Sequence, residues 1–143
     1  MIVEYCSVRS EAAEFGAGSL IPLAQTAVGR AWLWAQRPVI QGECIERIRN
    51  EADERGLSAI PGIYRSFQDL AERGYCFSHG EWMRDWHAIA TPLILAGGRD
   101  VLALAATATK PWSQETFFRD TVAPALIDAA ARIKSEMPRT ERV

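Results

Sequence analysis

The sequence predicts a single α+β domain in which an antiparallel β-sheet is flanked by helices. The chain has 143 residues, of which 48% are hydrophobic, so it is long enough for one ordinary core and too short for two comfortable domains. Three β-prone segments, 75–80, 86–95 and 101–108, follow one another through short connections, which favours an antiparallel meander. Segments with helical spacing of apolar residues lie before and after this meander.

The first half of the chain predicts one strand and three helices. Residues 1–8 are short, apolar and β-prone, and a loop follows them. Residues 24–36 are apolar almost all the way round, which predicts a helix buried on more than one side and makes its Trp34 a candidate subunit contact. A charged segment with one apolar stripe, 43–55, predicts a surface helix, and 63–73 predicts an amphipathic helix.

Glycine and proline divide these elements. Gly56 and Pro61 are expected to break the chain, and Gly74 is expected to cap the end of the third helix. In the last segment, apolar residues recur at helical spacing up to Ile133, with Ser113 as N-cap and a kink at Pro124. The charged end, 138–143, is expected to be a disordered tail.

Charge and cysteine content exclude several classes of function. The net charge is −2 and both signs are interleaved, so no basic face predicts DNA binding by this chain alone. Cys6, Cys44 and Cys76 are widely separated, which predicts neither a disulfide framework nor a zinc site and fits a reducing cytoplasm. We expect no membrane span, because no stretch reaches the roughly 20 apolar residues that cross a bilayer.

Small side chains recur on alternate positions of the predicted strands. Because side chains alternate between the faces of a sheet, each strand can be split into two sets. The small set consists of Cys76, Ser78, Gly80, Ala88, Ala90, Ala106 and Ala108. If these residues share a face, that face has room for either a closely docked helix or a ligand. The spacing alone leaves both alternatives open.

Several motifs, in order, resemble the effector-binding half of the isocitrate lyase regulator (IclR) family of bacterial transcription factors. They are Pro22–Ala31, Arg73–Tyr75, Glu81, Ala88–Pro92 and Val101–Leu104. The resemblance covers residues 1–137 and implies a GAF-like domain, with a curved antiparallel sheet and flanking helices, that senses a small-molecule effector without being an enzyme and without a cofactor.

The resemblance also carries expectations about partners. Family members form dimers or tetramers and bind DNA through a preceding helix-turn-helix domain, which this sequence lacks; the effector domain itself is expected to be N-terminally incomplete. Either the chain is a truncated piece or it is a detached sensor. We expect any self-association to use the Trp34-bearing helix.

The resemblance implies a set of ligand-binding positions. Carried over one at a time, with one inserted residue allowed in the turn at 96–100, they are Ile21, Ala27, Val28, Ser78, Ala88, Ala106 and Ala108. The last two stand where the family often has serines that bind a carboxylate. Since a buried carboxylate needs donors, these alanines predict a mostly apolar or aromatic effector, with Ser78 as the polar orienting group. Trp82, in the loop 81–86, is a candidate lid.

Two other functions remain open. An enzyme would use His79, Glu81, Asp85 and His87 as acid, base or metal ligands, although the two histidines are predicted to lie opposite the small face. Alternatively, the chain is an oligomerisation module with a closed core, in which an exposed Trp34 makes the contact and a helix packs tightly on the small face.

Overall fold

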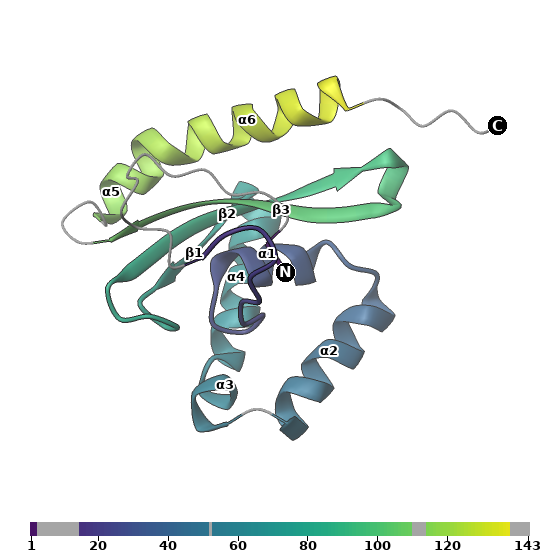
Figure 1. The fold of residues 1–143 in the computed structure, drawn as a ribbon, viewed down its shortest axis with the longest axis vertical. Helices are drawn as coiled ribbons and strands as arrows, with labels where there is room; N and C mark the ends of the chain where they lie inside the picture. Colours follow the sequence, from purple (N-terminus) through teal and green to yellow (C-terminus); the bar gives the residue numbers. More distant parts are fainter. Residues whose placement is uncertain (3–14, 52, 110–113, 138–143) are drawn as a thin grey trace.

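The computed structural model describes residues 1–2, 15–51, 53–109 and 114–137. A three-stranded sheet forms its middle layer, with α6 on one side and α1 and α4 on the other (Figure 1). This arrangement confirms the predicted α+β class with an antiparallel sheet flanked by helices. The predicted strand at 1–8, the N-cap Ser113 and the tail at 138–143 lie wholly or largely outside the described residues.

The sheet is an antiparallel meander in the order β1-β2-β3, as the short connections predict. Its strands are β1 Cys76–His79, β2 Trp86–Leu95 and β3 Asp100–Thr109. The β2–β3 turn contains Gly97 and Gly98 with φ values of 66° and 96°, a backbone conformation that glycine adopts without a steric penalty. The central strand β2 is the most deeply buried, because it has a neighbour on both edges.

The helices before the sheet differ from the predicted boundaries. They are α1 Ala27–Trp34, α2 Pro38–Glu51, α3 Glu54–Ser58 and α4 Ile60–Arg73. The single helix expected at 43–55 is wrong, since Asp53 caps a separate short helix by accepting a hydrogen bond from the Gly56 N–H. Pro61 lies in the first turn of α4, where its missing N–H costs nothing. Gly74 ends α4 at φ 83°, as predicted.

The C-terminal helical segment is interrupted just before Pro124. It consists of α5 Glu115–Phe117, a π-helical turn Phe118–Val122 and α6 Ala123–Glu136. Proline has no N–H to donate to the carbonyl four residues earlier, so a regular α-helix cannot continue unbroken through it. The irregularity therefore falls where the sequence predicts a kink, as a widened turn immediately ahead of the proline.

Buried residues form a core on each side of the sheet. On one side, α1 packs its alanines against β1 and β2; on the other, Phe118 and Leu126 pack against Ile89. Helix α1 also contacts α2 and α4, which confirms that it is buried on more than one side. Among the described residues, none of the helices combines the length and apolar character needed to cross a bilayer.

Candidate functional site

The strand register divides the sheet into two faces. Ser78 pairs with Ala88, and Ala88 pairs in turn with Thr107. Directly opposed residues of an antiparallel sheet share a face, so these three lie together. The face on the α1 side, called the α1 face below, consists of Cys76, Ser78, Trp86, Ala88, Ala90, Ala103, Ala105, Thr107 and Thr109.

The placement of Ala106 and Ala108 on the small face is wrong. Ala106 pairs with Ile89 and Ala108 with His87, and both alanines pack in the cluster around Phe118 on the α6 side of the sheet. The assignment of these two positions assumed one inserted residue in the β2–β3 turn. Because a shift of one residue along a strand moves every side chain to the opposite face, this assumption put the wrong alanines on the small face. The α1 face carries Ala105 and Thr107 instead.

Part of the α1 face is filled by the helix itself. Ala27 and Ala31 of α1 are completely buried against Cys76 and Ala90, and Val28 packs at the border of the same cluster. Ala27 is therefore covered by protein rather than open to a ligand. Close helix packing, one of the two alternatives open from the sequence, holds for this half of the face.

The other half of the face lies past the start of α1. The Cys76 thiol donates to the carbonyl oxygen of Ala27 at 3.4 Å, whereas Trp32, near the end of the helix, donates to the Val101 carbonyl at 2.9 Å. Helix α1 thus runs from Cys76 towards Val101. The row formed by Ser78, Ala88 and Thr107 is two residues further in the opposite direction.

Ser78 is a buried polar residue with an unused hydroxyl group. Its side chain is only 6% exposed, and the hydroxyl makes no hydrogen bond with any described residue. Because the hydroxyl oxygen is not itself sealed from solvent, it can form a hydrogen bond with water or with a ligand. The neighbouring Thr107 is exposed, and Ala88 is half-buried between the two hydroxyl side chains.

Three aromatic side chains gather near this row. The Phe15 ring lies 5.0 Å from Trp82 and 5.7 Å from Trp86, measured between ring centroids. Trp86 shares the α1 face with Ala88, and Trp82 comes from the β1–β2 loop as predicted. Phe15 was not predicted, because an isolated aromatic residue in a loop gives no periodic signal. Ile21 is half-buried in the segment leading into α1.

The β1–β2 loop is held by an ion pair whose arginine is buried and whose glutamate is partly exposed. Arg30 of α1 is 2% exposed, and its two terminal nitrogens donate to the two carboxylate oxygens of Glu81. The guanidinium Nε–H donates to the Ala24 carbonyl at 2.7 Å. Arg55 of α3 adds hydrogen bonds to the carbonyl oxygens of Glu81 and Trp82, at 3.4 and 2.8 Å.

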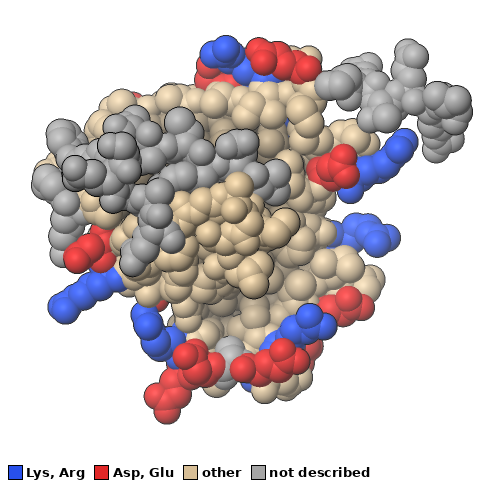
Figure 2. Space-filling model, in the orientation of Figure 1, with Lys and Arg blue, Asp and Glu red and all other residues tan. Residues whose placement is uncertain are grey.

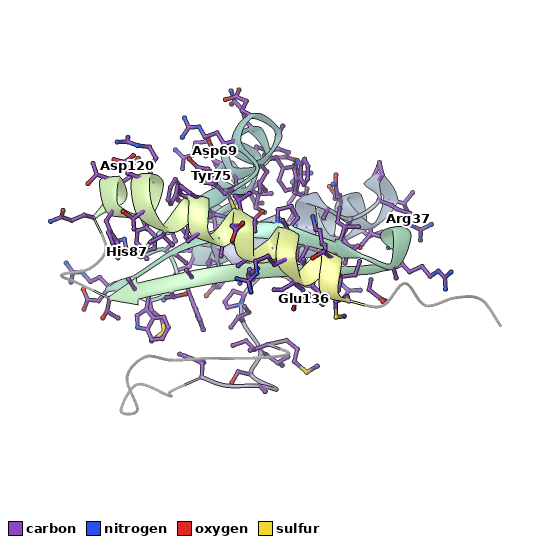
Figure 3. The ribbon with its side chains drawn as sticks, turned by 90° about the horizontal axis from the view of Figure 1, so that it is seen from above. Arg37, Asp69, Tyr75, His87, Asp120 and Glu136 are labelled. Carbon is purple, nitrogen blue, oxygen red and sulfur yellow. The ribbon has the colours of Figure 1, made fainter. Side chains whose placement is uncertain are left out.

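The candidate acid–base residues do not converge. His79 and His87 lie on the α6 face with their rings 5.8 Å apart, as the alternation predicts, while Glu81 is engaged by Arg30. Figure 3, viewed from the α6 side, places His87 at the Asp120 end of the sheet. Within the described parts of the chain, no cluster of three or more His, Cys, Asp or Glu side chains has the makings of a metal site.

A hollow of about 700 Å³ opens between α4 and the β1 edge, and its lining includes the Arg30–Glu81 pair but not Ser78. Its lining is largely charged and includes Arg55, Arg65, Asp69 and Arg73. The outer surface mixes charges as well, since Figure 2 shows both signs interspersed around the visible face. Neither the described lining of the hollow nor the described part of the visible face has the uniform positive charge that DNA binding requires.

Known proteins share this fold. No family model matches the chain. It is 25% identical over 140 residues to the HTH-type transcriptional regulator TsaQ1/TsaQ2 of Comamonas testosteroni, covering 96% of this chain and 50% of that protein. An IclR-family transcriptional regulator from Brucella abortus superposes with a TM-score of 0.79 and 32% identity, covering 87% of this chain and 47% of the regulator.

A second group of similar structures consists of isolated domains. The inducer-binding domain of the Acinetobacter transcription factor PobR, a double mutant in complex with 3-hydroxybenzoic acid, matches with a TM-score of 0.68 and 22% identity, covering 88% of this chain and 74% of that one. The chain spans about half the length of the full-length regulators it matches. Its fold is that of the effector-binding domains of IclR-family regulators, and the proteins that it matches are transcriptional regulators.

Proposed function

We propose that this domain senses a small molecule for an IclR-type transcriptional regulator, and that the effector binds at the Ser78 site. The Ser78 site comprises Phe15, Ser78, Trp82, Trp86, Ala88 and Thr107. DNA binding would belong to a separate domain. The observation that carries the proposal is Ser78 itself, 6% exposed with a hydroxyl that no described residue satisfies, next to a group of aromatic rings.

The side chains of the Ser78 site favour an aromatic effector that bears a hydroxyl group. Phe15, Trp82 and Trp86 offer ring surfaces, while Ser78 and Thr107 offer hydrogen bonds. The six residues of the site include no cation, and the nearby Arg30 is committed to Glu81. Thr107 adds a hydroxyl group to the site, so the site is more polar than the alanines predicted on β3 would make it. The PobR domain, crystallised with 3-hydroxybenzoic acid, supports the chemical class only.

A ligand screen tests this function. We expect phenol to raise the thermal midpoint with increasing concentration, and pyruvate and glyoxylate, whose carboxylates meet no free cation among the residues of the site, to have no effect. Ser78→Ala should weaken phenol binding about fivefold in calorimetry, the loss of one hydrogen bond worth about 1 kcal/mol. Ser135→Ala, on the exposed side of α6, serves as the control and should bind as the wild type does. Binding of short keto acids without binding of aromatic compounds would refute the proposal.

A closed oligomerisation module is the second candidate, and the burial of Ala27 and Ala31 under the sheet favours it. In that case no compound in the screen would shift the thermal midpoint.

Self-association through α1 is also part of our proposal. Trp34 is half-buried against the α1 face rather than exposed as expected, which leaves a smaller contact surface. Light scattering compares the mass of Trp34→Ala with that of the wild type. An equal mass would refute self-association through Trp34.

A cytoplasmic location completes the proposal. Cys44 and Cys76, the two described cysteines, are both free thiols, which fits a reducing compartment. Fractionation of cells that express the chain would test it, and recovery outside the cytoplasm would contradict it.

A further inference from the structure

The Arg30–Glu81 pair stands apart from the surface ion pairs of this chain by its burial and its geometry. The pairs Arg49–Glu46 and Arg119–Asp120 join exposed side chains close in sequence. Arg30 is 2% exposed, and it binds Glu81 through two parallel hydrogen bonds across 51 positions of the chain. A bidentate pair fixes the orientation of the carboxylate as well as its distance.

The surrounding helices are shaped to hold this arginine. Gly62 of α4 lies against it so closely that a Cβ atom there would be 2.5 Å from Nη2 of Arg30. The Ser66 hydroxyl, one turn further along α4, lies 3.5 Å from Nη1. Helix α4 therefore packs directly against the guanidinium group through Gly62 and Ser66.

The β1–β2 loop is fixed at both of its ends. The Gly80 N–H donates to the Trp86 carbonyl at 2.8 Å, and the Trp86 N–H donates to the Met83 carbonyl at 2.9 Å. Gly80 has a φ of 65°, and a Cβ atom there would lie 2.5 Å from the Arg84 carbonyl oxygen. Between these fixed points, Arg55 binds the Trp82 carbonyl at 2.8 Å.

We propose that Arg30, Glu81 and Arg55 are positioning residues that set the place of Trp82 in the Ser78 site, so that effector affinity depends on charges that the effector never touches. This inference rests on the proposed function for its effect on affinity, but not for the position of Trp82. Because Arg55 belongs to α3 and Arg30 to α1, the same contacts connect the site with the helices on the α1 side of the sheet.

Arg55→Ala provides the first test, since Arg55 is exposed and its loss leaves both side chains of the Arg30–Glu81 pair in place. The readout is acrylamide quenching of the ligand-free chain, with the Trp82 signal obtained by difference from the same variant carrying Trp82→Phe. We expect the Trp82 quenching constant to rise about twofold. Arg65→Ala, which removes another exposed arginine from the same hollow, is the matched control and should leave the constant unchanged.

Glu81→Gln provides the second test, because the amide preserves the shape of the side chain and removes its charge. We expect it to raise Trp82 quenching more than Arg55→Ala does. If Glu81→Gln fails to fold, Arg55→Ala alone decides. A quenching constant that stays at the wild-type value in every folded variant overturns the inference.

Phenol titration measures the effect on affinity. We expect Arg55→Ala to weaken phenol binding about fivefold, with the thermal midpoint of the free chain within a few degrees of the wild type. If the wild type itself binds no phenol while Trp82 quenching rises, the proposed function fails and the positioning role stands. Equal phenol affinity in the wild type and Arg55→Ala, together with increased quenching, would overturn the link between loop position and affinity.

Discussion

Individual residues in this domain owe their roles to close neighbours that the sequence does not reveal. Glu81 was a candidate acid or base in the sequence, and in the structure it neutralises Arg30. Ser78 was predicted as the polar group of the site; it lies on the α1 face with a hydroxyl that bonds to no described residue, and its role stays a prediction. Gly62 gives no distinctive signal in the sequence, although its lack of a side chain makes room for the buried Arg30.

Replacement of Gly62 tests this close contact. Gly62→Ala should lower the free energy of unfolding by about 2 kcal/mol, because the methyl group would displace the Arg30 guanidinium from its carboxylate. Urea denaturation measures the change. Gly42→Ala in α2 is the control, since no atom lies within 4 Å of its added Cβ; it should stabilise the chain by about 0.5–1 kcal/mol. Equal effects of the two substitutions would contradict the crowding at Gly62.

Cys76 should be chemically inert in the folded chain. Burial raises the pKa of its thiol to about 12 from 9.0, so the reactive thiolate is scarce at neutral pH. Mass spectrometry after brief treatment with a thiol reagent should find Cys44 labelled, and Cys76 labelled only after denaturation. Rapid labelling of native Cys76 would show that α1 opens readily.

The same shift makes stability depend on alkaline pH. The folded state holds the Cys76 proton up to about pH 12, while the unfolded chain releases it near pH 9.0, so the free energy of unfolding should fall as the pH rises between these values. Cys76→Ala should flatten this part of the stability curve measured by urea denaturation. An identical slope in the wild type and Cys76→Ala would be evidence against the shift.

At the scale of elements, the N-terminus of α1 is decisive because it separates the filled half of the α1 face from the Ser78 site. Thr26 caps the helix: its hydroxyl accepts a hydrogen bond from the Gly29 N–H at 3.1 Å and donates one to the Pro22 carbonyl at 2.7 Å. The predicted start of this helix at residue 24 was too early, since the cap fixes the boundary.

Substitution of the cap should therefore weaken the domain. Thr26→Ala should lower the free energy of unfolding by about 1–2 kcal/mol, because it leaves both the helical N–H and the Pro22 carbonyl without a partner. Thr26→Ser keeps the hydroxyl and should cost much less. If both variants lost the same stability in thermal denaturation, the methyl group rather than the cap would be responsible.

At the scale of the whole molecule, the two helical layers depend on the sheet between them. Phe118, 2% exposed, packs with Ile89 on the α6 side, while its neighbour Phe117 is 42% exposed. Phe118→Ala should cost about 3–5 kcal/mol and Phe117→Ala less than about 1 kcal/mol, as expected for buried and exposed positions. Circular dichroism and tryptophan fluorescence should report one common unfolding transition. Separate transitions would show that α6 unfolds independently.

Most of the fold could be predicted because its signals are local. Strand β2 was predicted at its observed limits and the Gly74 cap at its observed position, since alternation and glycine each leave a clear mark in the sequence. The break between α2 and α3 at Asp53 was not predicted, because the charged residues on both sides of it continue a helical pattern. Pro124 predicts an irregularity in the last helical segment. The sequence does not predict that this irregularity is a π-helical turn.

The sequence by itself determined the α+β class and the antiparallel meander, because these depend on patterns carried by neighbouring residues, and its motifs indicated the type of domain by resemblance. Tertiary structure alone decided which alanines face α1, since a register one residue different exchanges the faces of β3 without changing its composition. It also decided that Phe15 joins Trp82 and that Arg30 binds Glu81 across the chain. These contacts join segments distant in sequence, and only the packing of the layers brings them together.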